Sequence, residues 1–111
     1  MATTADTYGS MTVLTVEPAM TKAEVEAFRR TASEQIRAGG RWFVLDLARA
    51  NYFDSRGLEE LLWFQEQVQG VGGVIKVAGL RGNSRKVFEM VRFDKKFDVF
   101  DSVHEAVRNF G

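Results

Sequence analysis

The sequence contains no cysteine, a single proline and a single histidine, His104, among its 111 residues. Without cysteine it can form no disulfide, no thiol nucleophile and no thiolate metal site. One histidine by itself offers little to a metal ion, and His104 is expected to be a surface residue. We therefore expect neither a metal site nor a cofactor.

The sequence also lacks an excess of charge and any long apolar run. Fifteen basic residues balance fifteen acidic ones, which argues against a dedicated nucleic-acid-binding protein. No window approaches the 18 apolar residues or so of a membrane-spanning helix. Residues 1–10 (MATTADTYGS) have neither the basic start nor the apolar core of a signal peptide. We expect a cytoplasmic protein that does not insert into membranes.

What is present suffices for one hydrophobic core. Apolar residues make up 45% of the chain and aromatic residues 12%, and a chain of this length forms one domain. Residues 1–10 are small and polar without periodicity, so they are predicted to be a flexible leader before a folded domain at 11–111.

Strand and helix patterns alternate along that domain. Strands are predicted at 11–16, 41–47, 74–78 and 97–100, where short apolar or Val- and Thr-rich runs occur. Helices are predicted between them, from Thr21 to about residue 38, over 56–69, after Ser84, and from Ser102 to the end. Both Thr21–Glu24 (TKAE) and Ser102–Glu105 (SVHE) fit the capping-box pattern of a helix start. This alternation predicts an α/β fold with a largely parallel sheet.

The most informative stretch is 51–58 (NYFDSRGL), which joins the buried strand at 41–47 to the second helix. Asp54 or Ser55 is expected at the helix N-cap, with Gly57 inside the first turn. Backbone N–H groups converge at such a position, so an anion, including a phosphate esterified to Ser55, would be stabilised there. The ordinary alternative is that both residues only cap the helix, which is worth about 1 kcal/mol.

These residues, together with others along the chain, resemble the STAS domain, the family named for sulfate transporters and anti-sigma-factor antagonists. The resemblance covers residues 11 to the C-terminus and rests on Asp46-Leu47, Phe53-Asp54-Ser55-x-Gly57-Leu58, Leu61-Leu62, Gly72-Gly73, Phe97-x-Val99 and Glu105-Ala106. It implies the STAS fold, a mixed but mostly parallel sheet of four to five strands with about four helices.

The resemblance further implies a partner-switching regulator rather than an enzyme. Proteins similar to this one bind an anti-sigma factor, often a serine kinase of the histidine-kinase-like ATPase superfamily, and so release a sigma factor. Phosphorylation of the serine after the motif aspartate, here Ser55, ends that binding, and a PP2C-type phosphatase restores it. The partner-binding residues are predicted to be Asp54, Ser55, Arg56, Gly57, Trp63, Asn83 and Ser84.

Two departures from the family pattern leave alternatives open. Arg56 stands where many relatives have a second serine or another small residue, and this cation beside Ser55 could neutralise a phosphate or block a kinase. The first strand ends in Val16-Glu17-Pro18-Ala19, and the family's extra N-terminal strand is expected to be reduced or lost, which could expose a sheet edge for a homodimer. The alternative functions are a constitutive, unphosphorylated scaffold in a stress-sensing complex or lipid-transporter assembly and, more weakly, a nucleotide or small-molecule sensor.

Three further residues have ordinary alternatives to a functional role. Trp63 is expected to project away from the apolar stripe of its helix, either as an exposed partner contact or as a surface aromatic covered by a neighbouring loop. Ser84 could simply cap a helix. Ser55 is not expected to be a hydrolase nucleophile, because the G-x-S-x-G elbow is absent and the only histidine lies in another helix.

Overall fold

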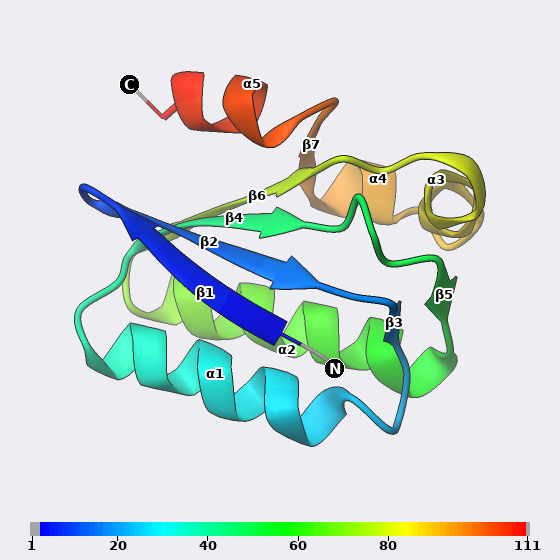
Figure 1. The fold of residues 1–111 in the computed structure, drawn as a ribbon, viewed down its shortest axis with the longest axis horizontal. Helices are drawn as coiled ribbons and strands as arrows, with labels where there is room; N and C mark the ends of the chain where they lie inside the picture. Colours follow the sequence, from blue (N-terminus) through cyan, green and yellow to red (C-terminus); the bar gives the residue numbers. More distant parts are fainter. Residues whose placement is uncertain (1–2, 111) are drawn as a thin grey trace.

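The computed structural model describes residues 3–110 and shows a five-stranded sheet between helical layers (Figure 1). In spatial order the strands are β1 (Thr3–Tyr8), β2 (Met11–Val16), β4 (Trp42–Asp46), β6 (Val74–Ala78) and β7 (Asp98–Phe100). β1 pairs with β2 in antiparallel fashion, and every other neighbouring pair is parallel. The predicted α/β class and the mixed, mostly parallel sheet are thereby confirmed.

Helices cover both faces of this sheet (Figure 1). α1 (Val25–Arg37) and α2 (Ser55–Gly70) lie on one face, where they bury the larger core, and α5 (Val103–Arg108) covers a smaller apolar cluster on the other. The remaining helices are α3 (Gly82–Met90) and the short α4 (Phe93–Lys96). No helix within residues 3–110 combines the length and apolarity that crossing a bilayer would require.

The N-terminal segment is a strand, so the expected flexible leader is wrong over residues 3–8. Every residue from Thr3 to Tyr8 is paired with β2, and Ala5 packs against the larger core. Most of its side chains are exposed, so the sequence shows no apolar alternation; the pairing follows from the tight turn at Gly9, whose φ is +62°. The N-terminal strand expected to be reduced or lost is therefore present. Met1 and Ala2, also assigned to the leader, lie outside the described residues.

The first helix begins three residues later than the capping-box pattern predicts. Glu24 Oε1 accepts a hydrogen bond from the Thr21 N–H (2.8 Å), but the Thr21 hydroxyl donates to the same carboxylate oxygen (2.6 Å) instead of accepting from the Glu24 N–H. The box therefore closes a turn that precedes α1. At α5 the prediction is confirmed, because Ser102 Oγ accepts from the Glu105 N–H (3.1 Å).

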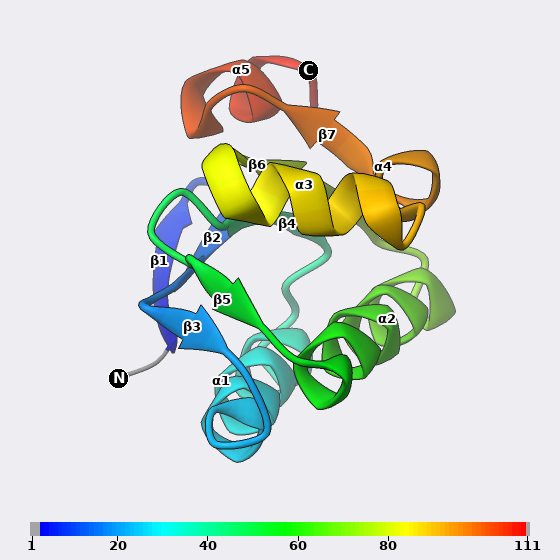
Figure 2. The ribbon, with the colours of Figure 1, turned by 90° about the vertical axis from the view of Figure 1, so that its right-hand side faces the viewer.

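A second, two-stranded sheet was not predicted from the sequence. β3 (Ala19–Met20) pairs in parallel with β5 (Tyr52–Phe53), at the end of the molecule where α1 and α2 begin (Figure 2). Two residues are too few for a periodic pattern to reveal. This small sheet brings residues 19–22 against the first turn of α2 and so shapes the region around Ser55.

Candidate functional site

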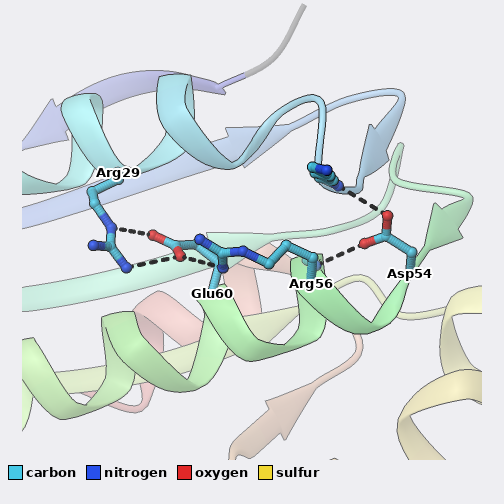
Figure 3. Close-up of polar contacts among 6 residues, drawn as sticks. Arg29, Asp54, Arg56 and Glu60 are labelled. Carbon is cyan, nitrogen blue, oxygen red and sulfur yellow. Dashed lines mark hydrogen bonds and ion pairs between the residues drawn. The ribbon is translucent and has the colours of Figure 1, made fainter.

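Asp54 organises the start of α2 through both of its carboxylate oxygens (Figure 3). Oδ1 accepts a hydrogen bond from the Gly57 N–H (2.8 Å), which caps the helix. Oδ2 accepts one from the Lys22 N–H (2.9 Å), 32 residues away in the chain. The expected N-cap is therefore Asp54 rather than Ser55, and the same side chain ties the turn before α1 to α2.

These hydrogen bonds also hold Asp54 in its charged form. The Lys22 N–H lowers the pKa of the carboxyl below its ordinary value, and the Gly57 N–H adds to that shift, while burial opposes it. Hydrogen bonds donated to a carboxylate favour ionisation. A fixed negative charge consequently lies directly before Ser55 at neutral pH.

A glycine is required at position 57 because the backbone of residues 20–21 lies very close to the first turn of α2. A Cβ built on Gly57 would lie 1.9 Å from the carbonyl oxygen of Met20 and 3.1 Å from the Thr21 nitrogen. Both atoms belong to backbone, which cannot rotate away as a side chain can. Glycine is therefore the residue that lets α2 begin beneath the small sheet, confirming its expected place inside the first turn.

Ser55 is the first residue of α2 and is exposed to solvent. Its neighbour Asp54 already caps the helix, so the Ser55 hydroxyl is not needed for that structural task. An exposed hydroxyl at a rigidly held helix start can be reached by another protein. His104, the only histidine of the sequence, lies in α5 on the opposite side of the sheet and is not placed to act as a general base for Ser55.

A buried carboxylate between α1 and α2 is the feature that the sequence analysis missed. Glu60 is fully buried, and Arg29 holds it with a two-pronged contact, Nε to Oε2 at 2.7 Å and Nη2 to Oε1 at 3.0 Å. Arg56 adds one contact of 3.2 Å from Nη1 to Oε1 (Figure 3). The hydrogen bond with Glu60 also raises the pKa of Arg29 above its ordinary value. Two cations therefore share one anion, and one of them, Arg56, is the residue directly after Ser55.

Helical spacing could have found Glu60. The buried residues of α2 lie on one helix face, and Glu60 is three positions after Gly57 and four before Phe64. A glutamate in such a stripe requires a cation, since an unpaired buried charge is very costly. The partner Arg29, however, lies 31 residues away, and only the packing of α1 on α2 brings it close.

Trp63 is half-buried, so its expected projection away from the core is wrong. Its side chain packs against the larger core cluster, and the Arg29 guanidinium lies 4.1 Å from the ring centroid. The covering element is α1 rather than a neighbouring loop. Trp63 thus helps to orient Arg29.

The two predicted partner contacts in α3 differ in exposure. Asn83 is exposed, and its Nδ2 donates to the carbonyl oxygen of Asn51 (2.8 Å), which places it beside the loop that leads to Ser55. Ser84 is buried, at 2% exposure. Its hydroxyl accepts from the Arg81 N–H (3.1 Å) and donates to the Arg81 carbonyl (2.8 Å). Ser84 therefore closes the start of α3, as its ordinary alternative predicted, and its contact with a partner stays a prediction.

Comparison with known proteins places this geometry in context. The family model of the STAS domain matches residues 2–106. Among curated proteins, the chain is 30% identical over 110 residues to BtrV of Bordetella bronchiseptica, which carries the name of a candidate anti-sigma factor antagonist; the match covers 99% of this chain and 95% of BtrV.

Solved structures of similar fold include further antagonists. An anti-sigma factor antagonist from Mycobacterium paratuberculosis superposes with a TM-score of 0.86 at 18% identity, covering 96% of this chain and 91% of that one. The Bacillus cell fate determinant SpoIIAA, in its phosphorylated form, superposes with a TM-score of 0.77 at 19% identity, covering 99% of this chain and all of its own (100%). At these sequence identities, the structural similarity shows that this chain shares the fold of the two proteins.

Proposed function

The chain belongs to the STAS domain family, and from this premise we propose that it is a cytoplasmic anti-sigma-factor antagonist that acts by partner switching. In the unmodified state, the exposed surface around Ser55 binds an anti-sigma factor that is also a serine kinase. Kinase action on Ser55 ends the binding, and a PP2C-type phosphatase restores it. The chain itself is the bound and modified component and performs no catalysis.

The observation that carries this proposal is the position of Ser55. It is exposed at the first residue of α2, while Asp54 performs the capping and is immobilised by the Gly57 and Lys22 N–H groups. Modification of Ser55 therefore changes the surface without removing a contact that the fold depends on. This arrangement suits a switch that is read by a partner.

The chemistry of the switch is a phosphoryl transfer from ATP. The Ser55 oxygen attacks the γ-phosphorus, the bond to the departing ADP breaks, and the hydroxyl proton passes to a base of the kinase. The product carries about −1.5 to −2 charge at neutral pH. A surface that fits a neutral hydroxyl, with the Asp54 carboxylate already beside it, becomes repulsive to a partner that approaches closely.

One of the two observations that favoured the alternative scaffold function does not hold in the structure. It rested on Arg56 and on the expected loss of the N-terminal strand, but that strand is present as β1. No feature of residues 3–110 specifically favours a nucleotide sensor either. We therefore retain partner switching as the proposed function.

The proposal is tested by binding measurements on matched variants. The partner is first captured from the native host with the unmodified protein, identified by mass spectrometry and purified. We expect Ser55→Asp to weaken its binding by about tenfold or more, because the added charge faces the interface, whereas Ser55→Ala should bind like the wild type.

Ser102→Asp is the matched control. Ser102 is exposed and caps α5 on the other face of the sheet, so the variant adds the same charge at a helix start, where aspartate is an equally good cap. Binding should be unchanged. Undiminished binding by Ser55→Asp, or no phosphate on Ser55 after incubation with the purified kinase and ATP, would refute the switch.

A further inference from the structure

The arginine that directly follows Ser55 shares one buried carboxylate with a second arginine. Glu60 contributes one negative charge, and Arg29 and Arg56 contribute two positive charges in contact with it. The Asp54 carboxylate is engaged by backbone N–H groups instead. One cation is therefore available beyond what the buried glutamate requires.

Arg29 alone satisfies the buried carboxylate. Its guanidinium contacts both oxygens of Glu60, at 2.7 and 3.0 Å, in the two-pronged geometry that makes arginine–carboxylate pairs strong. The ring of Trp63 supports the same guanidinium at 4.1 Å. If Arg56 moved away, Glu60 would keep its charge partner and no unpaired buried charge would be created.

Arg56 is held less firmly. It makes a single contact with Glu60 at 3.2 Å, to an oxygen that Arg29 already uses, and 45% of its side chain is exposed. Surface contacts of this kind contribute little stability. Arg56 is also the residue directly after Ser55, so the two Cα atoms are about 3.8 Å apart. Its long flexible side chain starts beside any group attached to Ser55.

We propose that Arg56 is the intramolecular partner of a phosphate on Ser55, and that Glu60 holds this arginine in reserve while the serine is unmodified. This inference rests on the proposed modification of Ser55. On phosphorylation, Arg56 exchanges its single contact with Glu60 for a charge-assisted pair with the phosphate. The exchange offsets the repulsion between the new phosphate and Asp54. Arg56 is thus a positioning residue for the phosphate.

The test measures the second ionisation of the phosphate directly. Phosphoserine is incorporated at position 55 during translation, so no kinase is needed, and the phosphorus NMR signal is titrated with pH. An adjacent cation favours the dianion, so the phosphate pKa should lie below its ordinary value of about 6. Arg56→Gln should raise that pKa by roughly half a unit or more, and Arg56→Lys should keep much of the lowering.

Arg37→Gln is the control for the loss of one positive charge. Arg37 is exposed at the far end of α1, two turns beyond Arg29, and its replacement should leave the phosphate pKa unchanged. The proposal is overturned if Arg56→Gln and Arg37→Gln give the same pKa, or if neither differs from the parent protein. Failure of the partner switch would show instead as unaltered binding of the phosphorylated protein, which this titration does not measure.

Discussion

Replacing Gly57 with alanine should destabilise the protein although it improves helix propensity. Alanine inside a helix is favoured over glycine by about 0.5–1 kcal/mol. Here the new Cβ would lie 1.9 Å from the Met20 carbonyl oxygen and 2.5 Å from its carbonyl carbon. Forcing an extra carbon into such a contact costs about 1–3 kcal/mol or more. We therefore expect Gly57→Ala to lower the free energy of unfolding by roughly 1–2 kcal/mol.

Urea unfolding of Gly57→Ala and Gly70→Ala provides the assay. Gly70 ends the same helix, and a Cβ there would meet nothing within 4 Å, so Gly70→Ala should be neutral or slightly stabilising. A common urea dependence of the unfolding free energy would show that both variants unfold by the same transition. If Gly57→Ala is as stable as the wild type, or if Gly70→Ala loses as much free energy of unfolding as Gly57→Ala, the close approach of the Met20 carbonyl is not the reason that glycine is required at position 57.

Two further predictions concern the carboxylates. Asp54→Ala should lower the free energy of unfolding by about 1 kcal/mol, measured in urea, since it removes the cap and the tie to Lys22. Because the pKa of Asp54 is lowered by folding, this contribution is complete above the unfolded pKa of about 3.9 and is lost as pH falls through the folded pKa. The difference between wild type and Asp54→Ala should therefore be constant above about pH 5 and shrink below about pH 4; a constant difference down to pH 2 would contradict it. At the buried pair, Arg29→Gln should cost about 2 kcal/mol and Arg56→Gln less than about 1 kcal/mol by the same assay, and equal losses would show that the two arginines share Glu60 evenly.

The helices and central strands follow closely from the sequence because their signals are local. Predicted strands at 41–47 and 74–78 correspond to β4 and β6, and the predicted helix at 56–69 to α2. Runs of apolar residues and helical spacing show which side chains will be buried, and both patterns can be recognised within one segment of the sequence. The STAS resemblance was likewise carried by a short motif whose Asp54 and Gly57 have identifiable structural tasks.

The sequence-based predictions were wrong or missing where the structure of a segment depends on backbone pairing or on packing against a distant part of the chain. β1 has mostly exposed side chains and is a strand because its backbone pairs with β2. β3 and β5 consist of two residues each, too short to produce a pattern. Trp63 was assigned outward from the spacing within α2 alone, but α1 covers it. In each case the deciding partner lies outside the segment.

The sequence by itself determined the α/β class, the order of the main elements, and an aspartate, serine and glycine at the start of the second helix. Tertiary structure decided what surrounds that serine. Contacts between residues 31 or 32 positions apart join Arg29 to Glu60 and Lys22 to Asp54, and they arise only when α1 and the small sheet pack against α2. A charge pair across two helices depends on the relative placement of both, which no single segment encodes, and so the cation held beside Ser55 became visible only in the folded chain.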